Sequence, residues 1–460
     1  MSDPTITTPS PVDVTGEART GFSSRLGFVL AAAGSAVGLG NIWSYPTQVA
    51  ENGGAAFVLV YFILTLMLAY PALVAELMIG RYGQSNPVSA LEKLPTNRLW
   101  QPVTRLSGFI AVLMICLIFS FYSIVGGWIA GFALAPLFSL AGLNDAAQWL
   151  ETFSPARNLI LAALFVVMTL SVVNGGIKNG IERWSARLMP LLLLLLLVLI
   201  AMVMTQKGAL TGLRHYLVPD FSLINTTLAL NALGQAFFSM SLGVGAMMVY
   251  GSYLNKSCNL PVVAFQVCLV DTGIAFLAGL LIIPALFVAV DLGITIYTPE
   301  GQLINSDTLV FQVLPALFNG LGTLGIPVAL AFFSLMTIAA LTSSISMLEV
   351  PVSCLTERAG MPRKKAGLLI CAGVCLVVAL ITVWFDPLFN GVIILTTHYA
   401  QPLDGLLFCL FAGWLMGRNR KLNELRQGWP EAENSLFWAI WPWYIRLVCP
   451  ALILMIFFMQ

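Results

Sequence analysis

The sequence contains little charge. Only 9% of its 460 residues are Asp, Glu, Lys or Arg, whereas soluble globular proteins carry about 25%. Its formal net charge of +1 also provides no basic surface for nucleic acid. We therefore expect a polytopic membrane protein that has no nucleic-acid partner.

Catalytic and metal-binding motifs are missing as well. The chain has no HExxH, GxSxG or GxxxxGKS/T motif and only two histidines, so it does not look like an enzyme. Its eight cysteines fall mostly inside apolar segments, which favours packed thiols over disulfides or a metal site. Residues 1–21 lack the layout of a cleaved signal, and we expect them to form a cytoplasmic tail.

Long apolar runs fill most of the chain, which is 58% hydrophobic with a mean hydropathy of +0.89. Because a bilayer core needs roughly 20 apolar residues per helix, these runs predict eleven transmembrane helices. The predicted helices lie near residues 25–50, 55–79, 105–137, 157–174, 187–205, 226–253, 259–290, 325–356, 364–384, 391–416 and 435–458. Within the long loop 291–322, LVFQVLPALF predicts a short helix over the outer face.

Lysines and arginines gather on one side of the predicted helices, and the opposite side has only Arg157, Lys207 and Arg214. Cytoplasmic loops carry the excess of basic residues in membrane proteins. We therefore expect a cytoplasmic N-terminus and, with an odd number of helices, an extracytoplasmic C-terminus in the cell membrane.

Two of the predicted helices are interrupted in the same way. AVGLGN (36–41) and SLGVGA (241–246) share small residues and a Gly-x-Gly at the same depth. Unwound backbone at mid-membrane is tolerated only where it lines an enclosed cavity, and paired interruptions indicate a transporter binding site. The alternative is close helix packing, which the GxxxG pair of Gly34 and Gly38 would also allow.

The first and sixth helices each open a group of five, so the two groups must insert with opposite topology. This predicts one transporter domain over residues 22–460. Its first repeat covers about 22–205 and its second repeat about 226–416, and an extra helix follows at about 435–458.

Five motifs carry a resemblance to a known family: RLGFVLAAAGSAVGLGNIW (25–43), ENGGAAF (51–57), ELMIGRYG (76–83), GQAFFSMSLGVGAMMVYGSY (234–253) and ALTSSISMLE (340–349). They resemble the neurotransmitter:sodium symporter family. The resemblance implies an all-α integral membrane protein of eleven helices, with a five-plus-five inverted repeat like the leucine transporter and unwound helices 1 and 6. This family is itself a standard example of paired broken helices at a binding site.

The resemblance also implies two sodium sites, which it places by position in the motifs. The first would use the Ala36 carbonyl, Asn41, Ser239 and Asp271. The second would use the carbonyls of Gly34, Val37 and Ala339 with the hydroxyls of Thr342 and Ser343. Sodium is a hard ion that favours such oxygen ligands, although Thr342 and Ser343 alone would more often bond to their own helix.

By the same resemblance, an amino-acid substrate lies between the broken helices. Its contacts would be Ala36, Leu39, Gly40, Ile118, Tyr122, Phe238, Ser239, Ser241, Val244, Ser343 and Met347. The amides of Leu39 and Gly40 and the Tyr122 hydroxyl would hold its carboxylate. The pocket is mostly apolar and uncharged, which favours a neutral, hydrophobic amino acid. Val244 stands where relatives often have an aromatic residue and leaves room for a larger side chain.

Acidic residues inside predicted helices are costly and therefore indicate function; here they are Glu76, Asp271, Glu349 and Asp404. Glu76 matches a structural acid that satisfies the freed amides of the sixth helix. Glu349, Asp404 and the lone His398 have no role that the resemblance implies.

The resemblance implies that chloride-dependent relatives bind the anion near the first sodium site. Asp271 stands at a sodium-ligand position that is usually asparagine, and Ala275 replaces the serine that would hold chloride. A fixed carboxylate supplies the negative charge itself, so we predict no chloride requirement. The alternative is a protonated Asp271 that shares a hydrogen bond within the helices.

The resemblance implies gates on both sides of the substrate. The inner gate would comprise Arg19, Phe22, Ser252, Tyr253 and Glu357, with an ion pair between Arg19 and Glu357. The alternative is a solvated surface pair, which contributes little. The Arg and Asp of the usual outer gate are replaced by Ser44 and Ile393, and the sequence does not indicate what replaces their pairing.

Together these features predict a sodium-coupled symporter that imports a neutral, hydrophobic amino acid by alternating access, as a monomer or homodimer. The altered outer gate leaves a passive channel or a substrate sensor on the same fold as the alternative.

Overall fold

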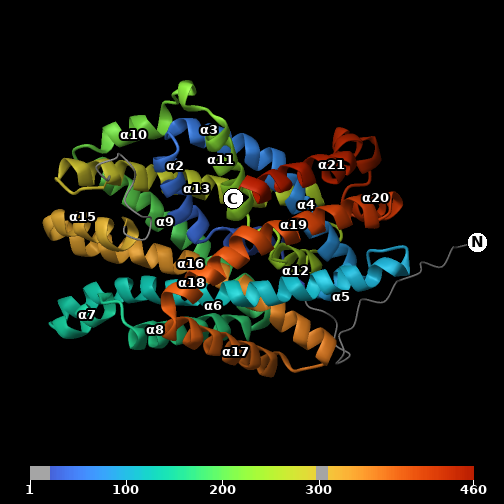
Figure 1. The fold of residues 1–460 in the computed structure, drawn as a ribbon, viewed down its shortest axis with the longest axis horizontal. Helices are drawn as coiled ribbons and strands as arrows, with labels where there is room; N and C mark the ends of the chain where they lie inside the picture. The colour runs from blue at the N-terminus through green and yellow to red at the C-terminus, as the bar shows by residue number, and fades with distance from the viewer. Residues whose placement is uncertain (1–20, 297–308, 460) are drawn as a thin grey trace, which may run out of the picture.

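The protein is a bundle of helices. A computed structural model describes residues 21–296 and 309–459, and no strand occurs within these residues. The all-α prediction is therefore confirmed. The long helices run side by side along the longest axis of the molecule (Figure 1).

The membrane-spanning character of the helices is clear from their length and composition. Eight are long and apolar enough to cross a bilayer, and two bent helix pairs qualify when each is taken as one span. The pair predicted as the sixth span falls outside this count because a turn divides it into two short helices. Every one of the eleven predicted segments is thus helical in the part of the chain that the structure describes.

The eight uninterrupted spans are the following: α3, η2 and α4 (Ala55–Leu64, Thr65–Ala69 and Tyr70–Gly83); η3 and α6 (Arg98–Trp100 and Gln101–Leu140); α8 (Pro155–Val173); η4 and α9 (Ile177–Glu182 and Arg183–Met204); α13 (Leu260–Asp291); α16 (Gly325–Ala359); α17 (Arg363–Val383); and α21 (Leu436–Met459). The fifth span begins at Ile177, ten residues before the predicted 187, because a π-helical turn continues directly into α9.

The divided spans are the first, sixth and tenth. They consist of α1 (Arg25–Ala36) with η1 and α2 (Gly40–Ser44 and Tyr45–Glu51); α11 (Thr226–Ser239) with α12 (Ala246–Ser252); and α18, η8, α19 and η9 (Phe385–Ile393, Ile394–Ala400, Gln401–Leu410 and Phe411–Leu415) followed by α20 (Arg418–Arg426). The first pair is bent by 59° and the last by 98°. Because α20 is rich in charge and turns away, it lies across the end of the tenth span.

Short helices mark the two ends of the bundle. One end has α5 (Pro87–Glu92) and α20, and the opposite end has α7 (Asn144–Glu151), α10 (Ala209–Leu217) and α15 (Leu314–Gly320) (Figure 1). The LVFQVLPALF segment forms η6 (Leu309–Val313) and α15, so the predicted short helix is confirmed. The predicted loop residues 297–308 lie outside the described part of the chain.

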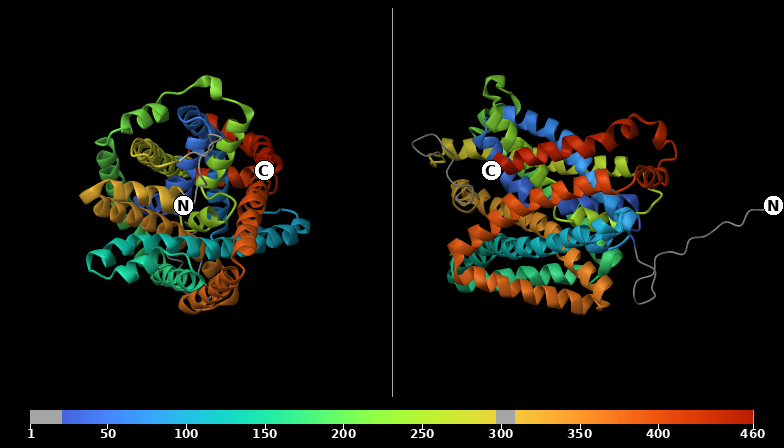
Figure 2. Two further views of the ribbon diagram at one scale, coloured as in Figure 1. Left: turned by 60° about the vertical axis from the view of Figure 1, so that its left-hand side comes forward. Right: turned by 45° about the vertical axis from the view of Figure 1, so that its right-hand side comes forward.

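The broken helices lie inside the bundle, where α1 contacts α9, α13 and α16. On one side of the bundle, α6 packs along α8, α17 and α16, and Figure 2 shows α6, α8 and α17 side by side there. Sequence-local signals set the ends of several of these helices. Ser24 caps α1 by accepting from the Gly27 amide at 2.9 Å, and Gly360, at φ 63°, ends α16.

Candidate functional site

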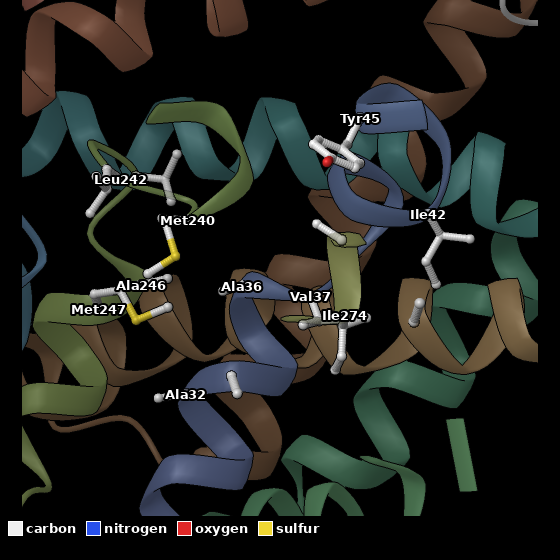
Figure 3. Packing of buried hydrophobic residues seen from close by; sticks show 14 of the residues in the cluster. Ala32, Ala36, Val37, Ile42, Tyr45, Met240, Leu242, Ala246, Met247 and Ile274 are labelled. Carbon is white, nitrogen blue, oxygen red and sulfur yellow. The ribbon is translucent and has the colours of Figure 1, made fainter. Parts of the chain in front are cut away.

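The first helix is interrupted where the sequence predicted it. The helix ends at Ala36, and the chain resumes a helical path at Gly40. The Gly38 amide, freed by the break, donates to Asn41 Oδ1 at 3.1 Å. A Cβ on Gly38 would lie 2.4 Å from Ser343 Oγ, so only glycine fits there. Figure 3 shows Ala36 and Val37 on one side of the break, with Ile42 and Tyr45 on the other.

The sixth helix is interrupted at residues 240–245. Ser241, Gly243 and Gly245 have φ values of 50°, 79° and 76°, the left-handed region that a helix excludes. A Cβ on Gly243 would lie 2.1 Å from the Gln401 carbonyl oxygen of α19. Met240 and Leu242 lie on the turn that joins the two halves (Figure 3).

Glu76 contacts this turn directly. Its Oε1 accepts from the Gly243 amide at 2.7 Å, and its side chain is buried. This is the geometry that the role of a structural acid requires, because the amide has lost its helical partner.

The side chains predicted for the first sodium site form one buried cluster. Asn41 Nδ2 lies 3.0 Å from Ser239 Oγ and 2.8 Å from Asp271 Oδ1, and Ser239 Oγ donates to Asp271 Oδ2 at 3.0 Å. Tyr61, which sequence reasoning missed, donates to Ser239 Oγ at 3.3 Å. The cluster joins both broken helices to α13.

Asp271 is fully buried, and among the described residues no lysine or arginine forms a salt bridge with it. A carboxylate in this position is costly unless a cation or strong donors compensate it. The donors to this carboxylate from the described side chains, Asn41 and Ser239, are neutral and leave its charge uncompensated. The cluster therefore has the chemistry to hold a small cation.

The residues predicted for the second sodium site also converge. Ser343 Oγ lies 3.2 Å from the Ser35 carbonyl oxygen and 3.0 Å from that of Val37. Thr342 Oγ1 bonds to the carbonyl oxygens of Ile338 and Ala339 in its own helix, at 3.1 and 3.0 Å. A Cβ on Gly34 would come within 3.4 Å of Thr342 Cβ. The site therefore offers carbonyl and hydroxyl oxygens from α1 and α16.

A cavity of about 380 Å³ lies between the broken helices. All the residues predicted to contact substrate line it, namely Ala36, Leu39, Gly40, Ile118, Tyr122, Phe238, Ser239, Ser241, Val244, Ser343 and Met347. The cavity continues past Trp128 and Phe389 to Glu51. Its volume suits a small molecule.

One polar atom in this cavity lacks a protein partner. The Tyr122 hydroxyl is buried beside the Ser343 side chain and the Leu39 backbone, and it makes no hydrogen bond of standard geometry within the described residues. Buried hydroxyls are normally satisfied, so an unpaired one facing a cavity indicates a ligand. Phe238, predicted as part of the outer lid, is 38% exposed and leaves the cavity open.

The structure also suggests what replaces the outer ion pair. Ser44 Oγ donates to Gln235 Oε1 at 2.9 Å, and Gln235 Nε2 donates to the Gly40 carbonyl at 2.9 Å. This neutral chain links the outer halves of the two broken helices, and Ile393 lines the same cavity as Ser44. Sequence reasoning missed Gln235, although an amide within the apolar GQAFFSMSLGVG motif was a signal.

The predicted inner-gate residues lie at the end of the bundle that carries α5. Phe22 makes edge-on contacts with Tyr250 and Tyr253, and its amide donates to the Tyr253 carbonyl at 3.3 Å. Ser252 Oγ donates to the Val249 carbonyl at 2.5 Å. Arg19 lies outside the described residues, so its pairing with Glu357 stays a prediction. Glu357 accepts from the amide and the side chain of Asn86 at 2.6 and 2.9 Å.

Glu349, to which the sequence gave no role, belongs to this end as well. It is fully buried, pairs with Arg363 and accepts from the Tyr253 hydroxyl at 2.9 Å. Glu349 lies within α16, Arg363 begins α17 and Tyr253 follows the end of α12, so no local pattern brings these residues together. Asp404 is buried in α19, and His398 lines a second cavity of about 340 Å³.

Comparisons with known proteins agree with this architecture. The model of the "Sodium:neurotransmitter symporter family" matches residues 19–142 and 153–460. The uncharacterized sodium-dependent transporter YhdH of Bacillus subtilis is 36% identical over 454 residues, which are 95% of this chain and 96% of that protein. An uncharacterized sodium-dependent transporter of Haemophilus influenzae is 33% identical over 95% of this chain and 97% of its own length.

A solved structure is similar over the same extent. The crystal structure of MhsT in complex with L-phenylalanine superposes with a TM-score of 0.80 at 36% identity, covering 96% of this chain and 99% of that chain. The match confirms the predicted leucine-transporter-like fold. The chain therefore belongs to the sodium:neurotransmitter symporter family and is a sodium-dependent membrane transporter, not an enzyme.

Proposed function

We propose that this transporter is a symporter that imports a neutral, hydrophobic amino acid together with sodium, by alternating access and without chloride. The observation that carries the proposal is the fully buried Asp271 beside Asn41 and Ser239, with no basic partner among the described residues. A bound sodium ion would compensate this carboxylate. The substrate's own carboxylate would lie next to the ion, within reach of the unpaired Tyr122 hydroxyl.

The side-chain end of the cavity supports an apolar substrate. Ile118, Val244 and Met347 line it, together with the small polar Ser343. With Val244 in place of a larger residue, the pocket accommodates a larger aliphatic or aromatic side chain. L-phenylalanine in the related MhsT structure is consistent with this proposal.

Alternating access is supported by the asymmetry of the cavity. It is continuous with the end that carries Glu51 and Phe389, whereas aromatic packing around Phe22 and Tyr253 closes the other end. We propose that the open end is extracytoplasmic, with the N-terminus in the cytoplasm. Each positive charge that moves inward gains about 2.3 kcal/mol per 100 mV, so co-entering sodium can drive accumulation.

A thermal-shift screen tests sodium coupling and the substrate class together. Purified protein is heated with single amino acids, first in sodium and then in potassium. A ligand that binds only the folded state raises apparent stability by mass action, so we expect large neutral amino acids to stabilise the protein in sodium alone. Equal stabilisation in potassium would contradict the proposal.

Transport itself is tested in proteoliposomes with an inward sodium gradient. We expect uphill accumulation of the best ligand, undiminished when gluconate replaces chloride. Downhill equilibration without a sodium requirement would favour the passive channel, and binding without flux would favour the sensor. Strict chloride dependence would contradict the role assigned to Asp271.

A further inference from the structure

The contact between η9 and α21 contains an arginine, Arg446, that lies within a membrane-spanning helix. Arg446 lies about 15 Å along α21, at the usual rise of about 1.5 Å per residue. Helical side chains point back toward the start of their helix, and α21 starts beside α20 at the end of the bundle (Figure 1). The guanidinium is therefore directed toward the adjoining membrane surface.

Three contacts fix the orientation of this guanidinium. Its Nε donates to the Gly413 carbonyl at 2.7 Å, and its central carbon lies 5.4 Å from the ring centroids of both Trp414 and Trp443. A Cβ on Gly413 would lie 2.9 Å from Arg446 Cγ, so glycine lets the two helices meet. The arginine is thus held rigidly between two indole rings.

The outward part of the guanidinium has no protein partner. Within the described residues, Nη1 and Nη2 of Arg446 make no hydrogen bond and no ion pair. Trp414 and Trp443 are 59% and 63% exposed, so the site faces the bilayer and not the core. Gly413 and Trp414 lie in η9, the last turn of the tenth span, so Arg446 lies beside the end of that span. Tryptophan and arginine near the end of a span are typical of the interface with lipid head groups.

A second cation adds to the positive charge here. Lys421 is fully buried, and its Nζ donates to the carbonyl oxygens of Ala412 and Gly413 at 3.0 and 2.9 Å. The Gly413 carbonyl thus accepts from both cations. A helix C-terminus carries only about half a negative charge, so it does not balance two positive charges.

Neighbouring acids do not neutralise this charge. Glu424 pairs with Arg81 at 2.7 Å, and Glu433 pairs with Arg426. Neither Lys421 nor Arg446 forms a salt bridge within residues 21–296 and 309–459. The described residues therefore leave room for an external anion to balance the charge at this contact.

We propose that Arg446, flanked by Trp414 and Trp443, binds the phosphate of an anionic phospholipid. Two free guanidinium nitrogens can bond two phosphate oxygens at once, and the indoles offer apolar walls for the glycerol and upper acyl chain. Basic pockets between transmembrane helices bind anionic head groups in this way. These residues do not line the substrate cavity, so the site is independent of the transport proposal.

Lipid titration of the full-length, delipidated protein in detergent tests this site. Dioleoylphosphatidylglycerol and dioleoylphosphatidylcholine are added separately, and both the unfolding temperature and the lipid retained in native mass spectra are measured. The phosphatidylglycerol lipid should stabilise the wild type more strongly. In Arg446→Gln its apparent affinity should fall roughly tenfold, the loss expected for a charge-assisted hydrogen bond.

Arg98→Gln is the matched control, because it removes the same charge from an exposed position at the same end of the bundle. It should retain the preference for the phosphatidylglycerol lipid. If Arg446→Gln does not fold, Trp443→Leu at the exposed ring should show the same loss. An unchanged preference in the folded variant would overturn the proposal, and so would equal stabilisation of the wild type by inorganic phosphate.

Discussion

At the scale of single residues, the central site depends on one fixed charge among neutral oxygens. Asp271 is the buried acid that joins Asn41 and Ser239, whereas the second predicted sodium site has carbonyls and hydroxyls alone. A carboxylate contributes full charge at a short distance inside a low-dielectric cluster. We therefore expect the first site to be the more sensitive to a change of charge.

Replacing Asp271 with Asn tests that difference. The substitution preserves shape but removes the negative charge, so the sodium concentration for half-maximal uptake should rise at least about tenfold, the equivalent of about 1.4 kcal/mol. Sodium titration of uptake in proteoliposomes measures it. Thr272→Val is the control at the next position, where a buried hydroxyl has no partner among the described residues. An unchanged sodium requirement in Asp271→Asn would contradict the assignment.

Tyr122→Phe tests the proposed carboxylate contact. The hydroxyl lies beside Ser343 and the Leu39 backbone but has no hydrogen bond of standard geometry to lose within the described residues, so thermal stability without ligand should change little. Substrate affinity should fall roughly tenfold or more, because a hydrogen bond to a charged group contributes about 1.5–3 kcal/mol. Tyr216→Phe provides the opposite case: its hydroxyl donates to the Phe276 carbonyl at 2.9 Å, and its loss should lower stability and leave affinity nearly unchanged. The reverse pattern would exclude Tyr122 from the site.

At the scale of elements, the broken helices are held open by contacts from their neighbours. Glu76 of α4 satisfies the amide of Gly243, and the α19 backbone at Gln401 packs against the same glycine. The break is therefore a joint between three helices and not a local weakness. This explains why a Gly-x-Gly run alone could not distinguish a binding site from close packing.

Gly243→Ala tests this joint. The new methyl group would lie 2.1 Å from a backbone oxygen at a φ of 79°, and the left-handed conformation alone costs about 1–2 kcal/mol. We expect a clearly lower unfolding temperature and loss of uptake. Gly273→Ala in α13 meets nothing within 4 Å and should be tolerated. Wild-type behaviour of Gly243→Ala in both assays would show that the close approach is not needed.

At the scale of the whole molecule, the sequence predicted the features that follow from local patterns and missed the hydrogen bonds and ion pairs between residues far apart in the chain. Apolar runs of bilayer length gave the positions of the helices, and paired glycines gave the breaks in the first and sixth. Two sets of bonds join separate helices: Ser44 with Gln235, and Glu349 with Arg363 and Tyr253. No periodicity in the sequence indicates such pairs. Helix starts differed where π-helical turns extend a span, as at Ile177.

The outer gate is the remaining feature on which the whole transport cycle depends. Ser44 and Ile393 line one cavity, and they stand at the positions that the resemblance assigns to the Arg and Asp of the usual outer ion pair. Ser44→Arg alone would place an unpaired charge on this wall and remove the bond to Gln235, so uptake should fall. Adding Ile393→Asp should recover it, with a coupling energy of about 1 kcal/mol or more between the two changes.

A double-mutant cycle on initial uptake rates measures this coupling. Ser44→Arg combined with Asn390→Asp is the control, because Asn390 lines the same cavity but does not occupy the predicted partner position. If both double variants recover equally, the added charge acts at long range and the cavity has no specific outer pair. If neither recovers, Ile393 does not face Ser44 when the cavity closes. If only the double variant with Ile393→Asp recovers, Ser44 and Ile393 face each other when the cavity closes.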